Sequence, residues 1–186
     1  MTDTAIVDLY WQRSETAIRE TENKYSNYLT KIAYNILANS EDSKESVNDT
    51  YLKAWNSMPQ HRPNELSTYL GRITRQISID GYRKRNAKKR QPSQYALSLS
   101  ELEECVPSKN NPEQEVESGL LDELINSFLR TVSSQASTVF LCRYYFMDSV
   151  NEIAENHNLT VSNVKTILRR TRLGLKEYLE REGFAV

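Results

Sequence analysis

The chain has 186 residues, of which 38% are hydrophobic, and its 24 basic and 25 acidic side chains nearly cancel. This length suits one large domain or two small ones, and no stretch approaches the ~20 apolar residues that a membrane helix needs. Residues 1–15 lack the basic and apolar segments of a secretory signal. Cys105 and Cys142 lie far apart in the sequence and suggest neither a metal cluster nor a disulfide framework. We therefore expect a cytoplasmic protein without a metal or another cofactor.

The charge is distributed unevenly along the chain. Residues 62–90 contain nine basic and two acidic residues, a local charge of +7, whereas residues 101–123 contain one basic and eight acidic residues, a local charge of −7. A second group of basic residues begins at Lys165. The first basic zone favours a polyanionic partner, most simply nucleic acid, although a solvated basic face near a helix C-terminus would also account for it.

Two helices are predicted before this basic zone. Residues 12–38 place apolar side chains at helical spacing with no Pro or Gly to interrupt them. Residues 41–58 form the next predicted helix, after a break and N-cap at Asn39 and Ser40. The second helix has a polar face that could simply be solvated. This face contains Glu45, Asn48, Asp49 and Lys53.

A turn that contains Pro59 and Pro63 leads into a third predicted helix, Glu65–Arg90. An apolar stripe and a second face of small side chains repeat along it, so we expect other helices to pack closely against it. The stripe consists of Leu66, Leu70, Ile73 and Ile77, and the small face of Gly71, Thr74, Ser78 and Gly81. Together the three helices predict an N-terminal domain over residues 1–90.

Residues 91–118 differ in composition from the segments on either side. Three prolines, many Ser and Asn residues and six glutamates leave too little apolar surface for the segment to order itself. We predict an acidic linker here, flexible or wrapped on a partner.

Residues 119–186 are predicted to be helical again. Ser149 with Glu152 three residues later forms a capping box that opens a short helix, Asn158 suits a tight turn, and Thr160 can cap a final helix over Val161–Glu180. This order is the helix-turn-helix arrangement, whose second helix enters the major groove of DNA. The residues predicted to face DNA are Ser162, Asn163, Lys165, Thr166 and Arg169, with Arg170, Arg172 and Lys176 placed to meet phosphates.

Three motifs occur in order along the chain. Residues 45–55 read ESVNDTYLKAW, similar to a family pattern DLVQETFLRAW, and residues 69–84 read YLGRITRQISIDGYRK, similar to WLYRIARNxxIDxxRR. Residues 149–155 (SVNEIAE) and 163–175 (NVKTILRRTRLGL) are similar to SYxEIAE and TVKSRLxRARxxL. With these motifs the chain resembles bacterial RNA polymerase sigma factors of the extracytoplasmic-function (ECF) type, in the sigma-70 family, over about residues 12–90 and 119–182.

The resemblance implies an all-α sigma factor with two small helical domains joined by the linker. Residues 1–90 would bind core RNA polymerase and recognise and melt the −10 element, and residues 119–186 would read the −35 element. The implied partners are promoter DNA, the clamp of the largest polymerase subunit and the flap of the second largest, with an anti-sigma factor as a further candidate and no membrane insertion. The implied clamp-binding residues are Glu45, Asn48, Asp49 and Lys53. The implied −10 contacts are Arg62, Asn64, Arg72, Arg75, Gln76, Arg83 and Lys84.

The chain departs from the family pattern at several positions. Asn48-Asp49 stands where Gln-Glu is usual, which shortens both side chains, and Asn163 stands where Thr is usual, so the set of base-reading residues should differ. Gly81 lies inside the basic helix and should weaken it by about 1 kcal/mol relative to Ala. It marks either the end of this helix or a close approach to DNA.

Three other classes of protein remain as alternatives. A stand-alone helix-turn-helix regulator would bind duplex DNA without polymerase and would need dimer contacts, but the sequence has no heptad seam. An enzyme acting on nucleic acid is disfavoured because the chain has only two histidines, no Cys/His cluster and no Gly-rich phosphate loop. An adaptor whose basic helix grips an acidic protein would show no preference for promoter-like DNA.

Overall fold

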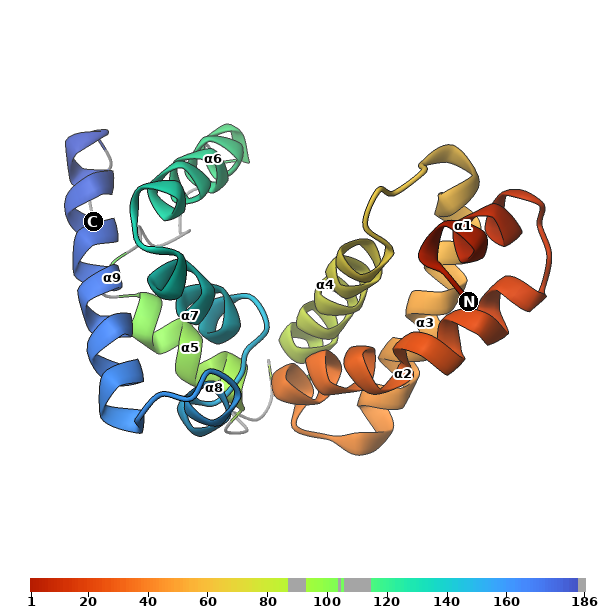
Figure 1. Cartoon of the computed structure of the whole chain (residues 1–186), viewed down its shortest axis with the longest axis horizontal. Coiled ribbons are helices and arrows are strands. Elements are labelled where there is room, and N and C mark those ends of the chain that lie inside the picture. The colour runs from red at the N-terminus through yellow and green to blue at the C-terminus, as the bar shows by residue number, and fades with distance from the viewer. Residues whose placement is uncertain (87–92, 104, 106–114, 184–186) are drawn as a thin grey trace. The chain divides into compact units, whose positions relative to one another are not determined.

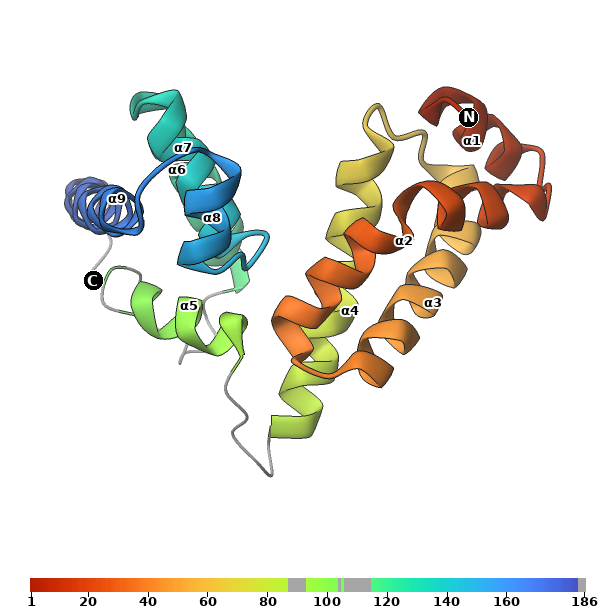
Figure 2. The same ribbon diagram turned by 60° about the horizontal axis from the view of Figure 1, so that its bottom comes forward.

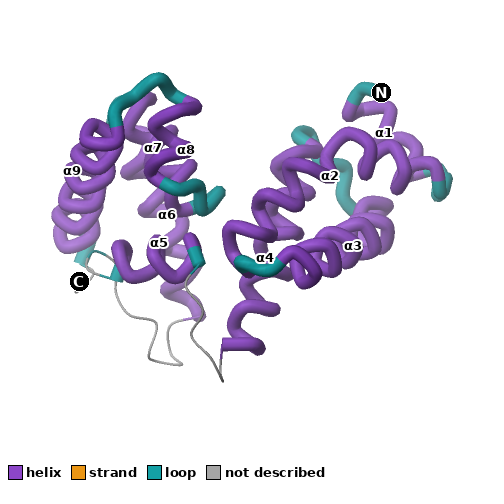
Figure 3. Tube along the Cα trace, turned by 90° about the horizontal axis from the view of Figure 1, so that it is seen from below, coloured by secondary structure: helices purple, strands orange, loops and turns teal. Residues whose placement is uncertain are grey.

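The structure is a computed structural model that describes residues 1–86, 93–103, 105 and 115–183. The chain divides into two compact units, Met1–Ser93 and Gln94–Val186 (Figure 1). All regular elements within the described ranges are helices, which confirms the all-α prediction (Figure 3). Within the same ranges, no helix combines the length and the apolar character that crossing a bilayer requires.

The first unit begins with two helices instead of one. Helix α1 spans Asp3–Trp11 and α2 spans Thr16–Leu37, so the prediction of a helix starting at residue 12 is wrong. The break lies at Arg13, whose φ of 56° is left-handed and cannot continue a helix. The Arg13 guanidinium holds this turn in place, because it donates a 2.6 Å hydrogen bond to the Trp55 carbonyl oxygen and lies 4.2 Å from the centre of the Trp55 ring.

Helices α2, α3 (Ser40–Ser57) and α4 (Leu66–Asn86) pack against one another as a bundle, and α1 lies against α2 (Figure 2). The Asn39 side chain caps α3 by accepting hydrogen bonds from two backbone amides of its first turn, as predicted. A short 3-10 helix, η1 (Met58–Gln60), leads from α3 toward α4. The apolar stripe of α4 is buried at Leu66, Leu70 and Ile73, so the predicted packing face is confirmed there.

Two glycines of α4 have different surroundings. A Cβ at Gly71 would lie 2.7 Å from Tyr28 Oη and 3.4 Å from Ile32 Cδ1, so the ends of two α2 side chains fill the space beside this glycine. A Cβ at Gly81 would meet only Leu37 Cδ2, at an ordinary 3.6 Å. Because α4 continues to Asn86, Gly81 does not mark the end of the helix, and that alternative is wrong.

Alanine at these two glycines should therefore change stability in opposite directions. We expect Gly81→Ala to raise the free energy of unfolding by up to about 1 kcal/mol, because Ala favours the helix and costs the unfolded chain more entropy. Gly71→Ala gains the same helix propensity, but it also forces the Tyr28 side chain to move. Overpacking of this kind costs about 1–3 kcal/mol, so we expect the free energy of unfolding to fall. Chemical denaturation of both variants measures the difference. A Gly71→Ala protein as stable as Gly81→Ala would show that the Tyr28 side chain moves aside at little cost.

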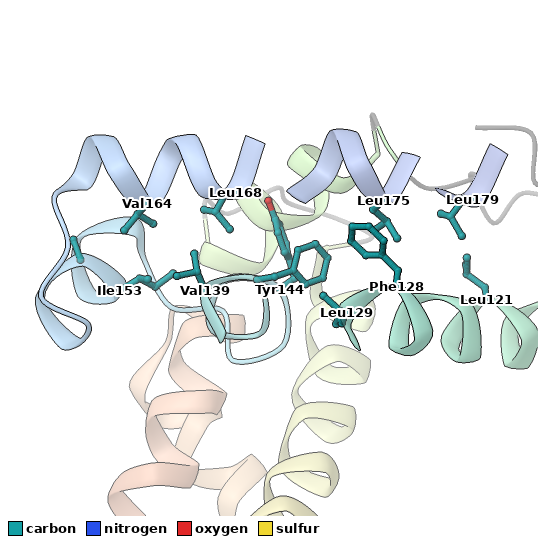
Figure 4. Packing of buried hydrophobic residues seen from close by; sticks show 12 residues of the cluster. Leu121, Phe128, Leu129, Val139, Tyr144, Ile153, Val164, Leu168, Leu175 and Leu179 are labelled. Atoms are coloured by element: carbon teal, nitrogen blue, oxygen red, sulfur yellow. The ribbon is translucent and has the colours of Figure 1, made fainter. Parts of the chain in front are cut away.

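The second unit contains five helices among its described residues. They are α5 (Gln94–Leu102), α6 (Glu115–Thr131), α7 (Ser134–Tyr144), α8 (Val150–Asn156) and α9 (Val161–Arg181). Apolar side chains of α6, α7, α8 and α9 form one core, in which Val139, Ile153, Val164 and Leu175 are fully buried (Figure 4). Helix α9 contributes to this core along most of its length.

The expectation that residues 91–118 cannot order themselves is wrong for Gln94–Leu102, which form α5. Tyr95 and Ser98 of α5 are buried, and Glu101 joins α5 to α7. The Glu101 carboxylate accepts hydrogen bonds of 2.7 and 3.2 Å from Arg143 and one of 2.9 Å from Tyr144 Oη. Part of the predicted linker, residues 106–114, lies outside the described residues.

The Glu101 network is a partly buried cluster of charges. The Arg143 residue is 2% exposed, and the Arg172 guanidinium lies 3.5 Å from the same carboxylate. Burial would raise the pKa of Glu101, but the hydrogen bonds and charge of Arg143, with smaller contributions from Tyr144 and Arg172, more than offset it and lower that pKa. Glu101 therefore stays ionised and neutralises Arg143 within the unit.

Candidate functional site

The exposed face of α3 carries a polar set around an apolar centre. Glu45, Asn48, Asp49 and Lys53 are all exposed, as predicted. Leu52 lies among them and is 59% exposed, which the sequence analysis did not single out. The buried positions Val47, Tyr51, Ala54 and Met58 show which face of α3 points to the core. Leu52 is apolar but lies off that face, and this is the sequence signal that could have identified it.

Leu52 lies where two shallow grooves meet. One groove is formed by α3, η1 and α4, and the other by α2 and α3. The first is lined by Asp49, Leu52, Lys53, Asn56, Ser57, Gln60 and Ile77. The second is lined by Glu15, Ile18, Arg19, Glu22, Leu52 and Trp55. An exposed leucine between two grooves that charged side chains flank is the arrangement of an interface centre with a polar rim, which suits a protein partner.

The basic helix α4 carries a second candidate surface. The predicted residues Asn64, Arg72, Gln76, Arg83 and Lys84 are exposed, and Arg75 is half-buried. Arg85 belongs to the fold instead, because its guanidinium pairs with Asp42 and donates a 2.5 Å hydrogen bond to the Leu37 carbonyl oxygen. The exposed residues leave a cationic, hydrogen-bonding face suited to phosphates and bases.

Arg62 differs from the other predicted residues of this surface. It precedes α4, and its guanidinium pairs with the Asp8 carboxylate of α1. The guanidinium carbon also lies 5.7 Å from the centre of the Trp11 ring. Arg62 is thus tied to α1 and is set apart from the exposed cations of α4.

Helices α8 and α9 form the predicted short helix, turn and long helix. The Ser149–Glu152 capping box is present, Asn158 is left-handed with φ 52°, and the Thr160 side chain caps α9 by accepting from the Asn163 amide. Buried Val164 and Leu168 anchor the N-terminal half of α9. The outward face of this half is exposed at Ser162, Asn163, Lys165, Thr166, Arg169 and Arg170.

The remaining two cations predicted on α9 are engaged within the unit. Arg172 donates a 2.6 Å hydrogen bond to Tyr144 Oη, and burial raises the pKa of Tyr144 well above its ordinary value, so that hydroxyl stays protonated. Lys176 lies 3.9 Å from Glu180 one turn further along α9. The structure thus brings six of the predicted residues together on one surface and separates Arg172 from them.

Comparison with known proteins matches the first unit to a described family. Residues 23–88 match the family described as Sigma-70 region 2, a segment that begins inside α2 and includes α3, η1 and α4 with their exposed surfaces.

Curated relatives extend this match along the chain. SigW of Bacillus subtilis, an ECF RNA polymerase sigma factor, is 24% identical over 168 residues, covering 89% of this chain and 90% of that protein. The sigma factor YlaC of the same organism is 27% identical over 165 residues, covering 88% and 90%. For SigE of Mycolicibacterium smegmatis, another ECF sigma factor, the identity is 23% over 166 residues, which are 88% of this chain but only 62% of that protein.

Residues 23–88 therefore carry a Sigma-70 region 2, and over most of its length the chain is similar to ECF RNA polymerase sigma factors. A solved structure of CnrH in complex with the cytosolic domain of CnrY aligns with 97% of this chain and 99% of that chain, at 18% identity and a TM-score of 0.45.

Proposed function

We propose that this chain binds core RNA polymerase, directs it to promoters through separate contacts to the −35 and −10 elements, and helps to open the DNA. The observation that carries the proposal is the matched segment itself: within residues 23–88, an interface-like face on α3 and a cationic face on α4 are both exposed. A factor that must hold polymerase and DNA at once needs two such surfaces on one rigid bundle.

The α3 face is the proposed polymerase contact. Glu45, Asn48, Asp49 and Lys53 would form hydrogen bonds and ion pairs with the clamp of the largest subunit, and Leu52 would be buried at the centre. Buried apolar anchors within a polar rim supply most of the affinity of such interfaces. The flap of the second largest subunit is the proposed contact of the second unit.

The α4 face is the proposed contact to the −10 element. Arg72, Arg75, Arg83 and Lys84 would follow phosphates, which makes binding salt-dependent. An unpaired base held near Asn64 would offset part of the unstacking energy, a few kcal/mol per step. The proposed place of action is the cytoplasm, where the polymerase works, with an anti-sigma factor as a candidate inhibitor.

The outward face of α9 is the proposed reader of the −35 element. Its N-terminal half would enter the major groove, where Ser162, Asn163, Lys165, Thr166 and Arg169 can reach base edges and Arg170 can reach a phosphate. Phosphate contacts are also proposed for Arg172 and Lys176. Arg172 would make this contact while it remains bonded to Tyr144.

Arg169→Ala tests this assignment. We expect it to weaken binding of the polymerase–sigma complex to duplex promoter DNA by about tenfold or more, the usual cost of losing a base-reading arginine. Arg181→Ala is a matched control, because Arg181 ends the same helix and lies 5.2 Å from the Tyr178 ring, away from the reading half. Anisotropy titrations with labelled promoter DNA measure both. Equal losses for the two variants would contradict the assignment.

A further inference from the structure

An aromatic side chain is exposed at the end of α1, beside the loop that leads into α4. Trp11 is 43% exposed, and the Arg62 guanidinium carbon lies 5.7 Å from the centre of its ring. Helix α1 contacts η1, and the two lie side by side (Figures 1 and 2). An indole ring and a planar guanidinium thus share one surface immediately before Asn64 and the cationic face of α4. Trp11 lies outside the segment that matches region 2.

The core of the first unit holds this surface in place. Tyr10, next to Trp11, is fully buried and shares a 2.9 Å hydrogen bond with Thr21 of α2. The carboxylate of Asp8, which also lies on α1, pairs with the Arg62 guanidinium. This carboxylate partly neutralises Arg62 and would repel a phosphate, so the local chemistry favours an uncharged planar group over a phosphate.

We propose that Trp11 and Arg62 form a stacking platform for an unpaired nucleobase of the opened promoter strand. Aromatic rings and guanidinium planes are the surfaces on which proteins stack unpaired bases, and such stacking tolerates any base. The strand would pass from this platform along the Asn64 loop to the cations of α4. The inference rests on the proposed contact of α4 with single-stranded DNA, and it adds α1 to that contact.

The two tryptophans of the chain allow a direct test. Trp55→Phe leaves Trp11 as the only tryptophan, and a base stacked on the ring should quench its fluorescence. The probe is a single-stranded DNA dodecamer of random sequence, and a duplex of the same length is the control. We expect saturable quenching by the single strand and little by the duplex. No quenching at concentrations where a labelled single strand is bound would overturn the proposal, and so would equal quenching by both.

Substitutions in the full chain separate stacking from charge. We expect Trp11→Leu to weaken binding of the single strand by about tenfold, within the range measured for stacking aromatics. Trp11→Phe keeps a ring and should lose less. Arg62→Lys keeps the charge but not the plane, so it should also weaken binding. Unchanged melting temperatures would show that the fold is intact, and the Trp11→Phe and quenching measurements still decide if Trp11→Leu does not fold.

The outcomes also separate this inference from the proposed function. If Arg72→Ala weakens binding of the single strand and Trp11→Leu does not, the α4 contact stands and the platform is wrong. If Arg62→Lys binds fully, Arg62 acts only as a charge and the platform is wrong. If neither Arg72→Ala nor Trp11→Leu changes binding, both proposals fail. Loss of polymerase binding in Trp11→Leu with normal binding of the single strand would instead indicate a protein contact, which also contradicts the platform.

Discussion

Leu52→Glu is expected to weaken binding to core RNA polymerase by about thirtyfold or more. The reason is that Leu52 is 59% exposed at the meeting point of two grooves, the place where an apolar anchor would be buried by the partner. Loss of an interface hot spot costs about 2 kcal/mol or more, and 1.4 kcal/mol is tenfold in affinity. A glutamate would add the cost of burying an unpaired charge. Competition binding with labelled sigma factor measures the change.

The substitution should leave the folded chain intact, because exposed positions usually change stability by less than about 0.5 kcal/mol. Tyr34→Glu is a matched control: Tyr34 lies on α2 of the same unit, is 53% exposed, and lines neither groove. We expect this variant to bind core polymerase with nearly normal affinity. If Leu52→Glu binds as well as Tyr34→Glu, the polymerase contact is not on this face of α3.

Glu101→Ala is expected to destabilise the second unit by about 2–4 kcal/mol. Removing one partner of a buried ion pair costs about 3–5 kcal/mol, because the other charge is left buried without compensation. Here the charge left without a partner is that of Arg143, which is 2% exposed. The expected loss of about 2–4 kcal/mol is below this range because the Glu101 side chain is 30% exposed. Calorimetry of the full chain, which can resolve the transition of this unit, measures the loss.

Two controls connect this loss to the charge network. Glu103→Ala removes an exposed acid close to α5 and should change little. Because the pKa of Glu101 is lowered by folding, its contribution is present above the unfolded value of about 4.5 and is lost as the pH falls through the lower folded value. The difference between wild type and Glu101→Gln should therefore fade below about pH 4.5. A difference that persists at lower pH would contradict an electrostatic origin.

Local chemistry made several parts of the fold predictable. The Ser149–Glu152 capping box and the left-handed Asn158 depend on residues a few positions apart, and both are present. In helix α4, apolar residues spaced by four and then three positions are buried, namely Leu66, Leu70 and Ile73. Such features need no knowledge of distant contacts, which is why the sequence indicates them.

The errors arose where distant contacts decide the structure. The sequence does not predict helix α1, because the turn after it depends on a hydrogen bond from Arg13 to Trp55, 42 residues away. Helix α5 does not follow from the sequence, because the acidic composition of residues 91–118 favours disorder and the partner of Glu101, Arg143, lies 42 residues later. The same limit applies to the candidate sites: exposure of the α3 and α9 residues follows from helical phase, but the pairings of Arg62 with Asp8 and of Arg172 with Tyr144 do not.

Transcription reconstituted from purified components tests the central claim most directly. The folded chain, added to core RNA polymerase on fragments of genomic DNA, should produce transcripts from a restricted set of promoters, and Leu52→Glu should abolish them while Tyr34→Glu does not. If the folded chain neither binds the core enzyme nor produces any transcript above the level of core alone, the proposed function is contradicted.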